Sequence, residues 1–390
     1  MPIKQKQTDS APPPRALYVH VPFCRAKCRY CDFHSAPLTG RAAQQFVVAA
    51  TRELDRHRTE FAEPLASVFF GGGTPTVLGA ALLGRLIDAA APLTGPDTEF
   101  SVEANPATLD KPLADHLAAG GVNRINLGVQ SFDDGELRLL GRIHTAADAA
   151  DAVDMLRTTG IANVGLDLIY GIPGQTMESW RRSLGKATAL APAHLSCYAL
   201  SFEAGTPLGE DLAAGRAAEM DESLQRDCYD AAITAAGEAG LEHYEISNFA
   251  RAGQRCRHNL TYWRNEPYVG IGPAAASYVA GERRTNDPDT PAYIDALLSG
   301  REPPATAERL GRRAAMAETL MLNLRLIEGA DRAAFARRFG TDPLEAFPLS
   351  FSRYAKLGAV IVTPSHVRIA PQSLFVADSI LADLIDEAAG

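Results

Sequence analysis

The chain has 390 residues, of which 46% are hydrophobic and 22% are charged, and its formal net charge is −9. This length accommodates one large domain and a smaller one, and the composition is that of an ordinary globular protein. The acidic balance argues against a broad nucleic-acid surface, because phosphate binding needs clustered Lys and Arg. We expect no membrane span, since no apolar stretch approaches the ~20 residues that cross a bilayer.

The first segment, residues 1–15, is polar and then proline-rich, and we expect it to be a disordered tail. Its first residues lack the apolar core of a secretory signal. We therefore expect a cytoplasmic protein whose thiols stay reduced.

Residues 16–205 alternate short apolar runs with segments of helical periodicity, such as 41–58 and 80–91. Strand, helix and strand at this rhythm predict parallel βαβ units, and six such units form an incomplete barrel or an open sheet. The six predicted strands are 17–20, 67–70, 99–103, 124–130, 164–170 and 194–200.

The pattern loosens from residue 206, and we interpret 206–304 as an extension that contains a helix at 221–240 and ends in a linker at 300–304. Residues 305–390 are expected to form a smaller, winged-helix-like α/β lobe. Its predicted elements are helices at 305–326 and 331–338, a hairpin of 360–363 with 366–369, and a last helix.

Three cysteines, Cys24, Cys28 and Cys31, stand within eight residues as C-x3-C-x2-C. Three thiolates can hold three corners of a [4Fe–4S] cluster, whose fourth corner is usually closed by another cysteine. Here position 33 is Phe33, so one iron would stay open, and an open metal position is a place for chemistry. A zinc site with His34 as fourth ligand is the alternative, whereas a disulfide set is a weak hypothesis without export.

Further polar or flexible residues follow the predicted strands, and the carboxyl ends of parallel strands form the usual active rim. The run Gly71-Gly72-Gly73-Thr74 would let a ligand approach the backbone and leave amide donors free; the alternative is a simple strand-to-helix turn, which would not need three glycines. Glu103 suits a ribose hydroxyl or a sulfonium, and the planar fork of Arg142 suits a carboxylate. Taken singly, each could be an ordinary surface or buried-pair residue.

The cysteine spacing resembles the signature of radical S-adenosylmethionine (SAM) proteins, in which SAM chelates the open iron through its amino and carboxylate groups. From Tyr18 to the C-terminal lobe, the motifs are similar to those of oxygen-independent coproporphyrinogen III oxidase and its close relatives. The resemblance implies a partial (β/α)6 radical SAM barrel that holds a [4Fe–4S] cluster on Cys24, Cys28 and Cys31. It also implies SAM contacts from Tyr18, Tyr30, Gly72, Gly73, Thr74, Glu103, Gln130, Arg142 and Asp167.

Two features favour the heme chaperone branch of these relatives over the oxidase. Phe33 stands where the oxidase has a further cysteine, and only 17 residues precede Tyr18, where the oxidase has a longer arm. A third marker is the motif His258-Asn259-x-x-Tyr262-Trp263, which that branch associates with heme. An imidazole ligates iron well and aromatic faces stack on a porphyrin. The alternative is a structural loop in which His258 is hydrogen-bonded in place and Trp263 anchors the core.

Other residues bear on the heme hypothesis. Cys256, two residues before His258, is a possible second soft ligand. Ala274 and Ala276 stand where relatives often show a glycine and sometimes a histidine, so His258 would have to carry more of the binding. No role is assigned to Cys197 or Cys228.

The leading hypothesis is therefore a heme chaperone that binds heme, a SAM-liganded [4Fe–4S] cluster and a membrane-bound respiratory hemoprotein as client. The protein would be cytoplasmic, with transient membrane association. The alternative is radical oxidative decarboxylation of coproporphyrinogen. An RNA-modifying radical SAM enzyme would call for a basic auxiliary domain, which the net charge of −9 disfavours.

Overall fold

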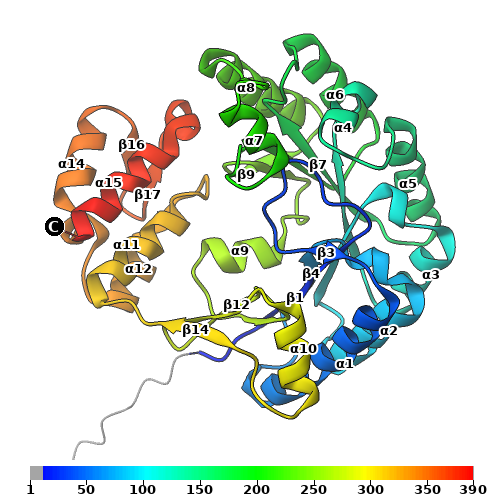
Figure 1. The fold of residues 1–390 in the computed structure, drawn as a ribbon. Helices are drawn as coiled ribbons and strands as arrows, with labels where there is room; N and C mark the ends of the chain where they lie inside the picture. Colours follow the sequence, from blue (N-terminus) through cyan, green and yellow to red (C-terminus); the bar gives the residue numbers. More distant parts are fainter. Residues whose placement is uncertain (1–11, 390) are drawn as a thin grey trace, which may run out of the picture.

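The computed structural model describes residues 12–389 (Figure 1). Most of the expected disordered tail, residues 1–15, lies outside the described part. The prediction was wrong at its end, because the carbonyl oxygen of Pro14 accepts a hydrogen bond from Ala62 N at 3.0 Å, and that of Arg15 accepts one from Ala66 N at 2.7 Å. These bonds hold the chain before the first strand begins.

Six parallel strands form the centre of the molecule, each within two residues of its predicted bounds. They pair in chain order, so that every crossover carries a helix on the outside, and the sheet curves into a partial barrel (Figure 1). The strands are β1 (Ala16–Val21), β4 (Ser67–Gly72), β5 (Glu99–Ala104), β6 (Arg124–Gln130), β7 (Asn163–Tyr170) and β8 (His194–Ala199). The predicted α/β fold class is confirmed.

Residues from the extension complete this sheet at both edges. β11 (Val269–Ile271) pairs parallel with β1. At the other edge, β10 (Asn248–Ala250) pairs antiparallel with β8, and β9 (Glu242–Glu245) pairs with β10. The extension is thus structurally part of the barrel.

Helices cover the outer face of the sheet, and their buried leucines, alanines and valines form one continuous core with it. The barrel helices are α1 (Gly40–His57), α2 (Gly79–Ala90), α3 (Lys111–Ala119), α4 (Asp134–Leu139), α5 (Ala146–Thr158), α6 (Met177–Ala189), α7 (Pro207–Ala213) and α8 (Glu222–Glu238). Thr145 and Thr176 begin α5 and α6 with capping boxes, in which each threonine and the third helical residue satisfy each other's amides.

One helical segment of residues 12–389, Pro75–Leu93, is long and apolar enough to cross a membrane, with a mean hydropathy of 1.4. The expectation that no stretch approaches this length was therefore wrong. The segment contains α2, which packs against α1 and α3 with Leu83, Leu86 and Ile87 buried. Its apolar character is accounted for by the core of the barrel.

The rest of the extension contains α9 (Arg257–Trp263), α10 (Thr290–Leu298) and a sheet of β12 (Ala276–Val279), β13 (Glu282–Asn286) and β14 (Ala305–Glu308). Buried Glu53 of α1 fastens it to the barrel, accepting hydrogen bonds from Gly272 N, Asn286 Nδ2 and Tyr293 Oη at 2.9, 2.8 and 2.5 Å. The helix predicted from 305 begins only at Arg312, because 305–308 pairs with β13. The extension's sheet thus crosses the expected boundary at 304.

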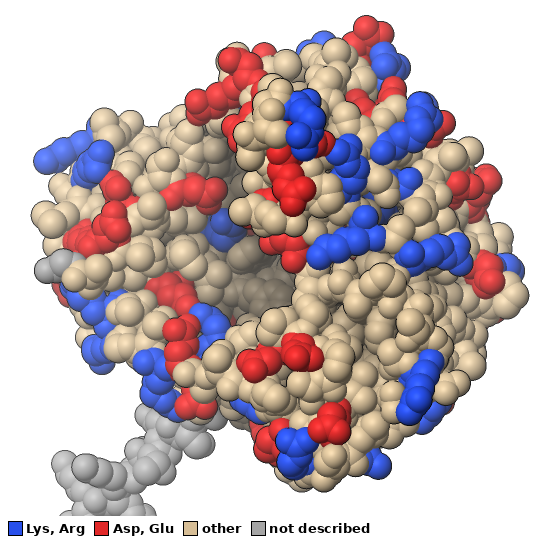
Figure 2. Space-filling model, viewed as in Figure 1, with Lys and Arg blue, Asp and Glu red and all other residues tan. Residues whose placement is uncertain are grey.

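The C-terminal lobe packs helices around a three-stranded sheet and lies beside the barrel (Figure 1), and Figure 2 shows a hollow between the two. The predicted hairpin is present as β16 (Val360–Val362) and β17 (His366–Ile369). The other elements are α11 (Arg312–Asn323), β15 (Ala330–Asp331), α12 (Arg332–Phe339), α13 (Pro343–Ala346), α14 (Pro348–Lys356) and α15 (Ala377–Ala389).

Candidate functional site

A cavity of about 420 Å³ opens at the carboxyl ends of the barrel strands. It is where the βα rule places a site in a parallel sheet. Every residue predicted to bind the cluster or SAM lines it except Tyr18: Cys24, Cys28, Cys31, Tyr30, Gly72, Gly73, Thr74, Glu103, Gln130, Arg142 and Asp167.

The three cysteines lie on a loop that is closed at its base by two short strands, β2 (Phe23–Cys24) and β3 (Ala36–Pro37). Arg29 N donates to Leu140 O at 3.0 Å and holds the loop against the end of α4. Cys24 Sγ lies 3.5 Å from Thr74 Oγ1, and Arg142 Nη1 donates to Cys28 Sγ at 3.2 Å. The loop thus presents partly exposed thiols to the cavity.

The donor set fits a cubane cluster better than a single ion. Within residues 12–389, no three His, Cys, Asp or Glu side chains are grouped to hold one metal ion. A cubane instead takes each thiolate on a different iron. Nε2 of His34, the fourth ligand of the zinc hypothesis, already bonds Thr290 Oγ1 at 2.9 Å.

The thiol of Cys31 is protonated in the free protein, which affects how a cluster is loaded. Burial raises the pKa of Cys31 to about 11. Because iron binds the thiolate, assembly must displace this proton.

The glycines at the end of β4, Gly72 and Gly73, are required by close packing. A Cβ on Gly73 would lie 2.5 Å from Phe23 O, and one on Gly72, whose φ is 101°, would lie 2.6 Å from the His20 ring. The expectation of free amide donors was wrong here, because Gly73 N donates to Val21 O at 2.8 Å, and Thr74 N to Phe23 O at 2.7 Å. Gly72 N bonds Glu103. The run therefore shapes the wall of the cavity without offering these amides to a ligand.

Glu103 and Asp167 form an acidic pair on neighbouring parts of the cavity wall. Glu103 Oε2 accepts a hydrogen bond from Gly72 N at 3.2 Å. Burial, and then the charge of Asp167, raise the pKa of Glu103 to about 8, against the lowering effect of Gly72. Burial also raises the pKa of Asp167, which bonds Ser196. A cation in the cavity would favour the ionised carboxylates.

Gln130 ends β6, and Arg142 lies in the connection between α4 and α5. The strand bulges between Gly128 and Gln130, and Gln130 has a φ of 70°. Arg142 donates to Gly128 O and to Cys28 Sγ, which leaves Nε buried without a partner among the described residues. Its fork is thus turned to the strand and the cluster loop, whereas the sequence predicted it to pair with a ligand carboxylate.

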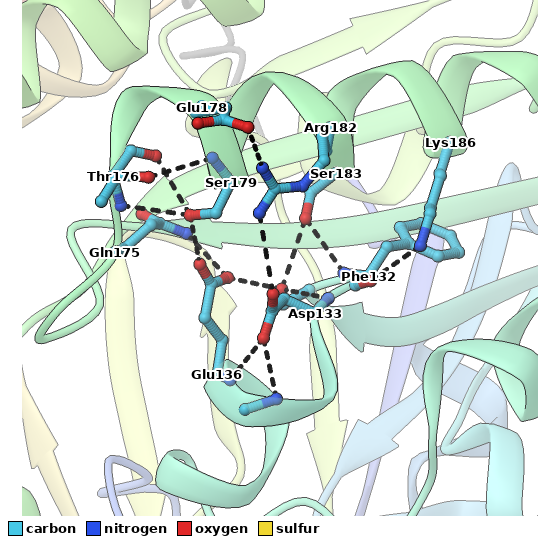
Figure 3. A network of polar contacts seen from close by, with 12 residues as sticks. Phe132, Asp133, Glu136, Gln175, Thr176, Glu178, Ser179, Arg182, Ser183 and Lys186 are labelled. Carbon is cyan, nitrogen blue, oxygen red and sulfur yellow. Dashed lines mark hydrogen bonds and ion pairs between the residues drawn. The ribbon is translucent and has the colours of Figure 1, made fainter.

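Behind this wall lies a network around Glu136 that the sequence analysis missed (Figure 3). Glu136 accepts hydrogen bonds from Ser131 Oγ, Ser179 Oγ and Gln175 Nε2 at 2.5, 2.6 and 3.0 Å. Gln175 Oε1 in turn accepts one from Gly171 N at 2.8 Å. The network fixes the ends of β6 and β7 beside the cavity.

Several lining residues were also missed, and for one of them, Asn126, a signal exists. Asn126 and Tyr198 line the cavity with the predicted residues. Asn126 is two and four residues before Gly128 and Gln130, and alternate residues of a strand share a face. Counting back along the strand in steps of two from Gln130 would have identified Asn126.

Tyr18 and the residues of the His258 motif do not line the cavity. Tyr18 Oη bonds His20 Nδ1 at 3.2 Å, and its ring lies 6.1 Å from that of His258. The motif forms α9, which packs against β4 and α11. The main-chain amides of Arg257 and His258 bond Glu99 Oε1 at 2.8 and 3.3 Å. Glu99 and Ser67 begin β5 and β4, so the motif contacts the strand ends opposite the cavity.

His258 is only 1% exposed, and both its ring nitrogens have partners. Nδ1 lies 3.0 Å from Ser67 Oγ and Nε2 lies 2.8 Å from Tyr262 Oη, while the ring stacks on Phe69. Burial lowers its pKa to about 3, so the imidazole is neutral. This arrangement matches the structural alternative for His258.

The remaining residues of the motif have separate surroundings. The Arg325 guanidinium lies 4.9 Å from the centroid of the Trp263 ring, whose indole nitrogen has no partner within residues 12–389. Asn259 is partly buried. Cys256 Sγ lies 3.6 Å from Glu99 Oε1, in the core. Ala274 has a φ of 63°, a conformation that a glycine adopts more easily.

A partial parallel barrel with three such thiols at its rim defines a radical SAM protein, and sequence comparisons agree. Residues 18–187 match the radical SAM superfamily, and residues 310–376 match the HemN C-terminal domain. The chain superposes on coproporphyrinogen III oxidase (HemN) from Escherichia coli with a TM-score of 0.81, covering 95% of this chain and 90% of that one at 22% identity. This likeness shows the same fold.

Closer relatives define the family. The chain is 31% identical to the heme chaperone HemW of Bacillus subtilis over 377 residues, which are 96% of this chain and 100% of that protein. It is 37% identical to HemW of Escherichia coli over 270 residues, 67% of this chain and 70% of that one. The chain belongs to the HemW family.

Proposed function

We propose that this protein is a heme chaperone, which binds heme and delivers it to a membrane-bound respiratory hemoprotein. The observation that carries the proposal is the similarity to a named heme chaperone over all of that protein's length. Phe33 supports it, because the oxidase-type fourth cysteine is replaced by an apolar side chain.

The cofactors proposed are a [4Fe–4S] cluster on Cys24, Cys28 and Cys31, with SAM beside it. A reduced cluster with an open iron can bind SAM and pass it an electron. The chain's own residues supply the surroundings: the Arg142 guanidinium faces the Cys28 sulfur, and Glu103 and Asp167 face the cavity as acceptors for a cation or for hydroxyl groups. Apolar walls and the bulge at Gln130 give the cavity its shape.

Heme contact by His258, Asn259, Tyr262 and Trp263 stays a prediction. For His258 to ligate iron, its ring would have to leave Ser67, Tyr262 and the face of Phe69. We therefore infer that any heme bound at the motif requires α9 to move. Cytoplasmic location and transient membrane association belong to the same proposal.

The test is a heme titration into the anaerobically reconstituted full chain, followed by the Soret band, with an assay for coproporphyrinogen decarboxylation in parallel. Saturable binding of one heme without decarboxylation is the expected result. Decarboxylation of coproporphyrinogen without heme binding would instead identify the oxidase. When an apo-hemoprotein client is then added, the bound heme should pass from this protein to the client. This second measurement tests the transfer step.

A further inference from the structure

The exposed large apolar side chains of residues 12–389 fall into two groups. Four lie around the cluster loop: Phe33 (62% exposed), Leu38 (38%), Ile143 (40%) and Tyr198 (40%). The other five, Leu349, Leu357, Val362, Val376 and Ile385, all lie in the C-terminal lobe. The surface of the barrel thus concentrates its large exposed apolar side chains at one place.

This place is the mouth of the cofactor cavity. Phe33 and Tyr198 both line the cavity, Phe33 from the cluster loop and Tyr198 from β8. Leu38 N bonds Cys24 O at 3.3 Å, and Ile143 follows Arg142, so the other two members flank the same loop. These four side chains, Phe33, Leu38, Ile143 and Tyr198, form an apolar lip around a polar cavity. Such a lip suits a flat ligand with apolar faces.

The lip also carries one cation, Lys27, with the carboxylates of Asp32 and Glu203 on the same lining. Lys27 lines the cavity and is exposed, and it makes no ion pair or hydrogen bond with the residues described. Asp32 and Glu203 also line the cavity. Arg29, two residues after Lys27 in the loop, is already paired with Asp211. Lys27 is therefore the cation of the lip left for a ligand's carboxylate, and heme combines two carboxylates with an apolar macrocycle.

We propose that heme docks on this lip, with its face against Phe33 and Tyr198 and a carboxylate on Lys27, above the cluster and away from α9. The inference rests on the proposed function, since it takes heme as the ligand. The buried, doubly hydrogen-bonded His258 supports it, because that ring is closed to heme in this arrangement. Heme held by its face at an open rim stays within reach of a client.

The experiment is a ferric heme titration into the anaerobically reconstituted full chain and four variants. Phe33→Ser should weaken binding about tenfold, because a phenyl face is lost, whereas Phe33→Leu should weaken it only about twofold to threefold. Lys27→Glu should weaken it about threefold to tenfold. The matched control is Leu349→Ser, whose side chain is 74% exposed in the C-terminal lobe, and its affinity should stay within about twofold of wild type.

The outcomes separate the site from the function. Iron content and melting temperature are measured for each variant, so that a loss of cluster or fold is not mistaken for a loss of heme. If wild type and Phe33→Ser bind heme equally, the lip is not the site, although the chaperone proposal stands. If wild type shows no saturable binding, the chaperone proposal fails and this inference fails with it.

Discussion

The two ends of the barrel carry the two motifs that point to function, and they are built in opposite ways. At the carboxyl end, partly exposed thiols, the unpartnered Nε of Arg142 and two carboxylates of raised pKa surround a cavity. At the amino end, α9 has its first amides on Glu99, and His258 has a partner on each ring nitrogen. The carboxyl end thus presents partly exposed groups to a ligand, whereas the His258 ring at the amino end already has its partners.

The amino end is stabilised by a buried ion pair that the cavity lacks. Arg124, with no exposed surface, lies 3.6 Å from Glu99 and donates to Asn126 Oδ1 at 3.1 Å and to Gln254 O at 3.0 Å. Asn126 lines the cavity, so the same network reaches from the cavity wall to the start of α9. The comparison teaches that a sequence motif associated with a ligand, here the His258 motif of α9, can also stabilise the fold by covering the amino end of the barrel.

The largest effect is expected at the carboxyl end of the barrel, where the three cysteines lie. Cys28→Ser should abolish stable cluster loading, since a three-thiolate set cannot lose a member and still hold the cubane. Iron and sulfide analysis after anaerobic reconstitution checks this. The metal-free variant should unfold at the temperature of the metal-free wild type, and a large drop would show that Cys28 also supports the fold.

At the amino end of the barrel, Arg124→Met should lower the free energy of unfolding by about 3–5 kcal/mol, because it leaves the Glu99 charge buried without its partner. Denaturant unfolding of the metal-free protein measures it. The double variant Glu99→Gln with Arg124→Met should recover much of the loss. A cost below about 1 kcal/mol would mean that the pair does not hold α9.

His258→Ala should cost about 2–4 kcal/mol in the same unfolding experiment, because the hydroxyls of Ser67 and Tyr262 lose their partner and Phe69 loses a stacked ring. Its neighbour Asn259, which is only partly buried, provides the control, and Asn259→Ala should cost less than about 1 kcal/mol. A stable His258→Ala variant that no longer binds heme would show that the ring is available to the ligand after all.

The smallest effect is a pH dependence at Glu103. With a pKa of about 8 in the folded protein and an ordinary value in the unfolded chain, this carboxyl binds a proton more tightly when folded. Its contribution to stability is therefore lost as pH rises from about 4.5 through 8. A cationic ligand favours the ionised form, so SAM affinity should rise about tenfold between pH 6.5 and 8.5.

Calorimetry of SAM binding in two buffers measures this, with Glu103→Gln as the control. The wild type should release protons on binding at pH 7, and the variant should bind with little pH dependence over the same range. Proton uptake by the wild type would contradict the assignment of Glu103 as an acceptor for the cationic part of SAM.

The strands and the rim were predictable because they depend on local pattern. Apolar runs marked all six barrel strands, and the rule for parallel sheets then gathered the cysteines, Glu103 and Asp167 at one end. Side-chain alternation alone would have added Asn126 to that set.

What could not be predicted depends on partners far away in the chain. The Arg257 amide bonds Glu99 across 158 residues, which places α9 at the opposite end from the cavity. The amides of Gly73 and Thr74 are taken by Val21 and Phe23, and no local pattern shows this. Residues 305–308 form a strand only because β13 lies alongside, so helical periodicity was a poor guide there.

The pairing of β1 with β11 sets an order of events during biosynthesis. β1 leads into the cluster loop, yet its outer edge is covered by residues 269–271, which leave the ribosome about 250 residues later at roughly 5–20 residues per second. Until then, the strand that supports the cysteines has a bare edge, open to wrong pairing. The strand that leads into the cysteine loop therefore gains both of its neighbours only after most of the chain has been synthesised.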